Sequence, residues 1–98
     1  MQITTEKNDN ELIIALEGSL DTLTSRDLEN ELKTSINDIE SLIIDMEKLD
    51  YVSSAGLRVL FKAYKTVSKK GKMTLKNVKP EVLEVLQVTG FDNFFNIE

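Results

Sequence analysis

Two adjacent serines, Ser53 and Ser54, are the residues whose type and position point most directly to chemistry. They lie between a mostly apolar run, residues 42–46, and a helix-like pattern that extends from Leu57 to about Ser68. A serine hydroxyl just before a helix can accept hydrogen bonds from the free N–H groups of the first turn. The same N–H groups, together with the helix dipole, favour a bound anion such as a phosphate. The pattern therefore predicts either a helix cap or a serine that accepts a phosphate group.

The composition excludes most catalytic chemistry. The chain contains no histidine and no cysteine, which removes the usual general base, every histidine-based triad, disulfides and thiolate metal sites. It also lacks a glycine-rich phosphate loop. Asp45 and Asp50 are the carboxylate pair to consider for acid–base work, but a strand-end cap and a surface charge are the interpretation that we favour. We therefore expect a protein that is not an enzyme and that holds no metal and no cofactor.

The charge is unevenly distributed along the chain. Residues 1–50 carry a net charge of −9 and residues 51–98 carry +4, within an overall net charge of −5. This asymmetry predicts one acidic and one basic surface, an arrangement that can steer a protein partner. The overall acidity argues against nucleic-acid binding. No apolar run is long enough to span a membrane and the N-terminus does not resemble a signal peptide, so we expect a cytoplasmic protein without membrane contact.

Hydrophobic periodicity predicts a single α/β domain over residues 1–98. Hydrophobic residues make up 41% of the chain, which is enough to bury a core. The predicted strands comprise residues 2–7, 12–18, 42–44 and 72–76. The predicted helices begin near Thr24, Leu57 and Pro80, and a core-covering tail follows Gly90. Strands that alternate with such helices build right-handed crossovers, so we expect a mixed sheet of four or five strands with helices packed mainly on one side.

The first crossover is expected to begin with a loop and a capped helix. Gly18 ends the second predicted strand, and residues 18–21 form the loop. Thr24 and Asp27 have the spacing of a capping box, with Asp in place of the usual Glu. The helix that follows carries one apolar stripe at helical spacing, made of Leu28, Leu32, Ile36 and Ile39.

The segment before the two serines is expected to leave the sheet. Residues 47–50 carry the chain over the end of the sheet, and Tyr51 and Val52 return inward. In open α/β sheets, function tends to lie beyond the carboxyl ends of the strands. The turn at Ser53 and Ser54 is predicted to lie at such an end.

A stripe of basic residues follows one side of the helix after the serines. Its members are Arg58, Lys62, Lys65 and Lys69. A solvated helix face is the interpretation that we favour for this stripe. A nucleotide bound to the basic face is a weaker alternative.

Three separate motifs, in order along the whole chain, resemble the STAS domain family. Residues 45–60, which include the stretch Tyr-Val-Ser-Ser-Ala-Gly-Leu, resemble the core motif of these domains. Residues 18–21, Gly-Ser-Leu-Asp, together with Thr24 resemble a second family segment, and residues 77–91 resemble the family's C-terminal motif. STAS domains occur in bacterial anti-sigma factor antagonists and at the ends of sulfate transporters.

The resemblance implies an anti-sigma factor antagonist that acts by partner switching in the regulation of transcription. In such a pathway the unphosphorylated antagonist binds an anti-sigma factor, which is itself a serine kinase that binds ATP. Sigma factor is released, the kinase then phosphorylates the antagonist and breaks the complex, and a phosphatase resets the switch. The position of the family's acceptor serine corresponds to Ser54. The resemblance thus implies a phosphoprotein whose partners are a kinase and a phosphatase.

The resemblance also implies a surface for the partner. Asp21, Ser53, Gly56 and Arg58 fall, with Ser54, in the expected partner-binding surface. Asp45 matches an acidic residue that ends the family's central strand.

The chain departs from the family pattern on either side of the expected acceptor. Ser53 stands where the antagonists have Asp, and Ala55 stands where they have Ser or Thr. Three alternatives follow: Ser53 as the acceptor, Ser54 as a simple helix cap, and a constitutive STAS adaptor in a signalling or transport assembly that is never phosphorylated.

Overall fold

The computed structural model describes all residues from Met1 to Glu98. The chain forms five strands, three α-helices and one short 3-10 helix. In chain order these are β1 (Gln2–Asn8), β2 (Glu11–Leu20), α1 (Thr24–Ser35), β3 (Ser41–Val52), α2 (Ser54–Val67), β4 (Lys72–Lys76), α3 (Pro80–Thr89), η1 (Phe91–Asn93) and β5 (Asn96–Ile97).

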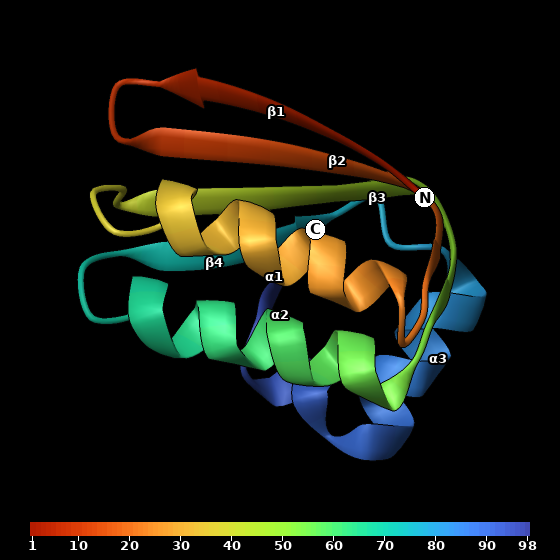
Figure 1. Ribbon diagram of the computed structural model, residues 1–98. Coiled ribbons are helices and arrows are strands. Elements are labelled where there is room, and N and C mark those ends of the chain that lie inside the picture. The colour runs from red at the N-terminus through yellow and green to blue at the C-terminus, as the bar shows by residue number, and fades with distance from the viewer.

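The strands form one mixed sheet in the order β1-β2-β3-β4-β5. β1 and β2 form an antiparallel hairpin, and the remaining neighbours are parallel. Each crossover from β2 onward moves to the next strand in the same direction. Right-handed crossovers that all move one way place their helices on one face, and Figure 1 shows the helices below the sheet. The predicted fold class is therefore confirmed, with five strands.

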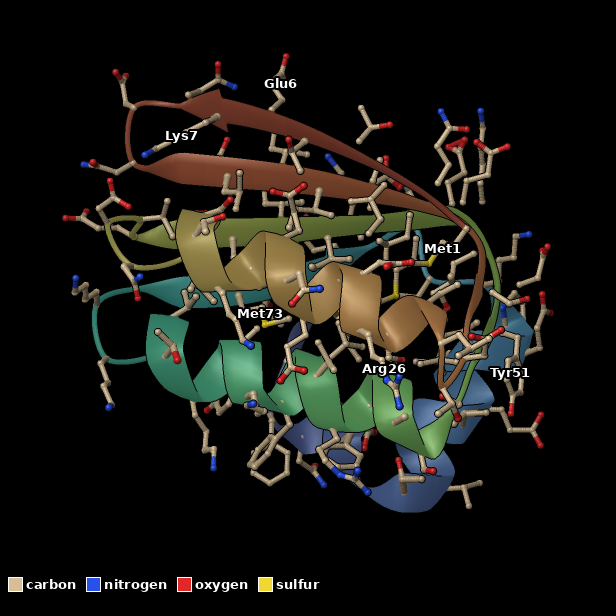
Figure 2. The ribbon with its side chains drawn as sticks, viewed as in Figure 1. Met1, Glu6, Lys7, Arg26, Tyr51 and Met73 are labelled. Atoms are coloured by element: carbon tan, nitrogen blue, oxygen red, sulfur yellow. The ribbon has the colours of Figure 1, made fainter.

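The hydrophobic core lies between the sheet and the helices. It contains 23 buried apolar residues, and alternate positions of the strands point into it. Leu12, Ile14 and Leu16 of β2 face the helices, and Figure 2 shows Met73 of β4 between the sheet and the helix layer. The predicted apolar stripe of α1 is confirmed for Leu28 and Leu32, which are buried on the helix. Ile36, the C-cap, and Ile39, beyond the end of the helix, are also buried, so the helix is shorter than the stripe predicted.

The second and third strands are longer than predicted. β2 continues through Gly18 to Leu20, and β3 includes residues 47–50 and continues to Val52. The predicted loop at residues 18–21 and the predicted crossing over the sheet end are therefore wrong. The pairing between the two strands shifts register twice, after Ala15 and after Gly18. Such β-bulges absorb extra residues and bend the strands without ending them.

At the end of β3 and in the C-terminal tail, only some of the apolar side chains are buried. Val52 is buried as expected, but Tyr51 is 52% exposed, so the prediction that both side chains turn inward is wrong for Tyr51. The C-terminal tail covers the core as predicted, because Phe95 is buried. Phe94 of the same tail is 44% exposed. No helix of the structure is both long enough and apolar enough to cross a membrane.

Gly71 allows a close approach of two connecting segments. A Cβ atom at this position would lie 1.6 Å from the backbone oxygen of Glu40, in the segment before β3. That oxygen accepts a hydrogen bond of 3.1 Å from the N–H of Lys72 at the start of β4. The turn after α2 is thus held against the turn after α1, which aligns β3 and β4 and so supports the segment that carries the serines.

Candidate functional site

The two serines lie at the carboxyl ends of parallel strands, as predicted. The backbone N–H of Ser53 donates a hydrogen bond of 2.8 Å to the carbonyl of Leu20, the last residue of β2. This contact places the junction between β3 and α2 next to the loop that begins at Asp21. Figure 1 shows the starts of α1 and α2 together at this end of the sheet, and Figure 2 shows Tyr51 there as well.

Ser53 is the N-cap of α2. Its backbone is extended, with φ −89° and ψ 172°, and its hydroxyl accepts a hydrogen bond of 3.1 Å from the N–H of Gly56. Its carbonyl accepts a further hydrogen bond of 2.9 Å from the N–H of Leu57. The side chain is half-buried. Because its oxygen already satisfies the first turn of the helix, Ser53 has the structural role that the sequence had left open between the two serines.

Ser54 is the first residue of α2 and is exposed to solvent. Its hydroxyl makes no hydrogen bond, in contrast to that of Ser53 one residue earlier. The alternative in which Ser54 caps the helix is therefore wrong. A free hydroxyl at the first position of a helix is accessible to a kinase, and a phosphate there would meet the positive end of the helix dipole.

Asp21 organises the neighbouring loop. One carboxylate oxygen accepts hydrogen bonds from the N–H groups of Leu23 and Thr24, at 3.0 Å and 2.9 Å. The Thr24 hydroxyl in turn accepts a hydrogen bond of 2.8 Å from the N–H of Asp21. This reciprocal pair has the pattern of a capping box and lies just before α1, whose boundary residue Leu23 makes no side-chain capping hydrogen bond. The predicted pairing of Thr24 with Asp27 is therefore wrong.

The hydrogen bonds to Asp21 also stabilise the charged form of its carboxylate. The hydrogen bond from the backbone of Thr24, followed by the one from its side chain, lowers the pKa of Asp21. Asp21 is therefore ionised at neutral pH and places a fixed negative charge beside the end of β2. Its other carboxylate oxygen makes no hydrogen bond within the chain and is free for a partner.

Gly56 lies beneath the surface of the site. It is buried, and a Cβ atom would lie 2.8 Å from Cγ of Leu20 and 3.0 Å from Cγ2 of Val52. The prediction that Gly56 contacts a partner is therefore corrected. The absence of a side chain lets the first turn of α2 pack onto β2 and β3, which positions Ser54.

Arg58 and the carboxylates considered earlier occupy different places. Arg58 is exposed on α2, one turn after Ser54. Asp45 lies within β3 and does not end it, since the strand continues to Val52. It accepts hydrogen bonds from the N–H of Glu47 and the side-chain amide of Asn77.

The two carboxylates considered for acid–base work do not form a pair. Asp50 pairs with Lys79, whereas Asp45 binds Asn77, so these two carboxylates hold separate parts of the surface. No cluster of three or more His, Cys, Asp or Glu side chains could hold a metal ion. The arrangement offers a free hydroxyl, a fixed carboxylate and exposed side chains, which suit recognition and modification.

Two exposed apolar residues beside the site were not predicted. Leu23, in the loop after Asp21, is 72% exposed, and Tyr51, before Ser53, is 52% exposed. The alternation of β3 contained the signal for Tyr51, because an inward Val52 requires an outward neighbour. Leu23 does not belong to the apolar stripe of α1, and this was the only indication in the sequence that its side chain would be exposed. Exposed apolar side chains of this kind are common in protein interfaces.

The chain is thus a small α/β domain with a mixed sheet that is covered by helices on one face. Its central strand, β3, leads directly into α2, which is capped by Ser53 and begins with the exposed Ser54. Residues 2–98 match the model of the STAS domain family. The chain therefore belongs to the STAS domain family.

Two relatives at 30% identity or above support this membership. One is BtrV of Bordetella bronchiseptica, provisionally named an anti-sigma factor antagonist, which is 35% identical over 99 residues. That alignment covers 99% of this chain and 85% of BtrV. The other is an anti-sigma F factor antagonist of Paenibacillus polymyxa, 30% identical over 93 residues, covering 92% of this chain and 80% of the relative.

Solved structures share the fold at lower identity. The unphosphorylated form of the anti-sigma factor antagonist SpoIIAA matches with a TM-score of 0.86 at 21% identity, covering 99% of this chain and 88% of that one. The phosphorylated form of SpoIIAA from Bacillus matches with a TM-score of 0.78 at 20% identity, covering 99% and 91%. An antagonist from Mycobacterium paratuberculosis matches with a TM-score of 0.88 at 23% identity, covering 98% and 83%. At these identities the likeness concerns the fold.

Proposed function

We propose that this protein is an anti-sigma factor antagonist that is controlled by reversible phosphorylation of Ser54. It binds an anti-sigma factor that is also a serine kinase, and the kinase holds the ATP. A phosphatase removes the phosphate from Ser54 and restores binding. The protein acts in the cytoplasm as a binding module and not as an enzyme.

One observation carries the proposal: Ser54 is exposed with a free hydroxyl, whereas Ser53 is engaged as the N-cap. A kinase needs access to an acceptor hydroxyl, and Ser54 offers this without loss of the cap. The names of the relatives from Bordetella bronchiseptica and Paenibacillus polymyxa support the class of partner. Ser53, which stands where the antagonists have Asp, is a poorer acceptor than Ser54, because its hydroxyl oxygen is already bonded to the N–H of Gly56.

Phosphorylation acts as a local electrostatic gate in this proposal. A phosphate on Ser54 adds about −1.5 to −2 charges at pH 7. The helix dipole tolerates the added charge, so the fold survives. Asp21 holds a negative charge in the adjacent loop, so the phosphate makes the surface more negative at the place where the partner docks. Partner binding is lost through repulsion, with no large conformational change.

A comparative pull-down from native lysate tests the proposal. The baits are wild type, Ser54→Ala and Ser54→Asp, and captured proteins are identified by mass spectrometry. We expect an ATPase with an anti-sigma factor sequence on the first two baits and its loss from Ser54→Asp. Capture of the same partners by all three baits contradicts the gate and favours a constitutive adaptor.

A further inference from the structure

The exposed face of α2 is the strongest unassigned feature of the molecule. Arg58, Lys62, Lys65 and Lys69 follow one another at helical spacing on this face, and all four are exposed; we call them the α2 strip. Lys69 lies in the turn just after the helix. Ser54 stands at the start of the same face, one turn before Arg58. The strip therefore begins at the proposed phosphorylation site and extends away from it along the helix.

The strip is not neutralised within the chain. Among its four side chains, only Lys62 pairs with a carboxylate, at 2.6 Å from Glu29 of α1. Helix α2 contains no acidic residue, so like charges are neighbours at spacings of three and four, which destabilises a helix. The dipole of α2 favours Lys65, in the last turn of the helix, but gives no such support to Arg58, near its beginning. A second molecule that supplied negative charge would relieve the repulsion between these neighbouring cations.

A cluster of aromatic side chains borders the strip; we call it the aromatic ledge, and it consists of Phe61, Tyr64, Phe91 and Phe94. Phe61 of α2 packs against Phe94 of the C-terminal tail, with ring centroids 5.0 Å apart, and Lys65 Nζ lies 5.3 Å from the centroid of Phe61. Phe94 also packs against Tyr64 at 5.8 Å and Phe91 at 6.1 Å. Phe94 is nevertheless 44% exposed. A ring that is held by three neighbours and still faces solvent is a preordered apolar anchor, a feature common in protein interfaces.

We propose that the α2 strip and Phe94 form a docking surface for an acidic segment of the protein partner that also carries an apolar side chain. Charge complementarity selects the occupant, because the strip presents cations and the exposed ring of Phe94 presents aromatic carbon beside them. Nucleic acid is a poorer occupant, since the chain as a whole has a net charge of −5. The surface extends the site of the proposed function and rests on it.

The proposal explains how one phosphate can release the partner. A phosphate on Ser54 places negative charge at the beginning of a surface that attracts negative charge. It then repels the acidic segment and competes for Arg58, which lies four residues away on the same face of the helix. The gate and the docking surface are thus continuous along α2.

Charge reversal tests the surface. The variant Lys65→Glu/Lys69→Glu is compared with Lys48→Glu/Lys76→Glu, which has the same net charge but changes exposed lysines of strands β3 and β4. The probe is the ATPase identified with the Ser54→Ala bait, purified and titrated at several salt concentrations. We expect the α2 variant to bind at least tenfold more weakly with a shallower salt dependence, and the control to bind within twofold of wild type. Phe94→Ala is expected to weaken binding without changing the salt dependence.

A replacement variant and two further probes separate failure of the docking surface from failure of the proposed function. Should Lys65→Glu/Lys69→Glu fail to fold by circular dichroism, Lys65→Gln/Lys69→Gln replaces it, with the same expectation of weaker binding. Unchanged ATPase affinity in the α2 variant overturns the docking surface, while loss of binding in Ser54→Asp still upholds the proposed function. Stronger binding of wild type to a 20-nucleotide single strand or to anionic phosphatidylserine vesicles than to the ATPase overturns the acidic-protein assignment. Capture of no ATPase by Ser54→Ala overturns both proposals.

Discussion

Ser53 and Ser54 differ at the residue scale by a single hydrogen bond, which assigns them different roles. Both are small, polar and adjacent, so their sequence context could not separate a cap from an acceptor. The distinction depends on the residue at which α2 begins, and helix boundaries are poorly defined by periodicity alone. The observed start at Ser54 commits the Ser53 oxygen to Gly56 and leaves the Ser54 hydroxyl free.

Substitution of each serine by alanine should separate stability from function. Ser53→Ala removes the cap and is expected to lower the free energy of unfolding by about 1 kcal/mol. Ser54→Ala serves as its matched control and should change stability by less than about 0.5 kcal/mol, because its hydroxyl has no partner in the chain. Urea unfolding of the two variants measures the difference, and equal losses would contradict the assignment of the cap.

The capping box of Asp21 predicts a dependence of stability on pH. Because the pKa of Asp21 is lowered in the folded state, its carboxylate contributes fully above the ordinary aspartate range. The contribution is lost as the pH falls through the lowered folded-state pKa. The stability advantage of wild type over Asp21→Asn should therefore shrink on acidification. Urea midpoints of both proteins between pH 7 and pH 3 test this, and an advantage that grows toward pH 3 would refute it.

At the scale of elements, local patterns predicted the helices better than the ends of the strands. The apolar stripe of α1 and proline at the start of α3 are local signals, and both elements formed where expected. The ends of β2 and β3 depend on pairing between distant segments and on two β-bulges. A polar run such as residues 47–50 resembles a loop, but strand pairing holds it in β3 and buries Leu49.

Two glycines test how tightly the elements are packed. Gly71→Ala should be the more damaging change, because its Cβ would overlap the backbone oxygen of Glu40, which cannot rotate away. Gly56→Ala meets side-chain atoms of Leu20 and Val52 and should cost about 1–3 kcal/mol, as overpacked core substitutions do. Thermal unfolding ranks the variants, and a Gly71→Ala protein as stable as wild type would disprove the close approach.

At the scale of the whole molecule, the sequence predicted an acidic and a basic surface but not which side chains would form them. Most of the basic charge in residues 51–98 lies on or just after α2, and the α2 strip emerges only when the helix is placed with that face toward solvent. The aromatic ledge joins residues of α2 to the C-terminal tail, about thirty positions apart in sequence, so no local pattern could indicate it. The family motifs predicted the fold and the region of the site, whereas the packing decided which residues reach the surface.

The gate model predicts that negative charge at Ser54 leaves the molecule folded. Ser54→Asp places a carboxylate at the start of α2, where the dipole stabilises it by about 0.3–1 kcal/mol. Its melting temperature should therefore equal or slightly exceed that of wild type, while partner binding is lost. Differential scanning calorimetry and an amide NMR spectrum measure this. Widespread shift changes across the sheet would instead indicate a conformational switch.

Phosphate mapping with the purified partner kinase tests the central claim most directly. Wild type, Ser53→Ala and Ser54→Ala are each incubated with the captured kinase and ATP, and peptide mass spectrometry locates the phosphate. We predict one phosphate on Ser54 in wild type and in Ser53→Ala, and none in Ser54→Ala. Phosphate on Ser53, or continued phosphorylation of Ser54→Ala, would contradict the assignment of Ser54 as the acceptor.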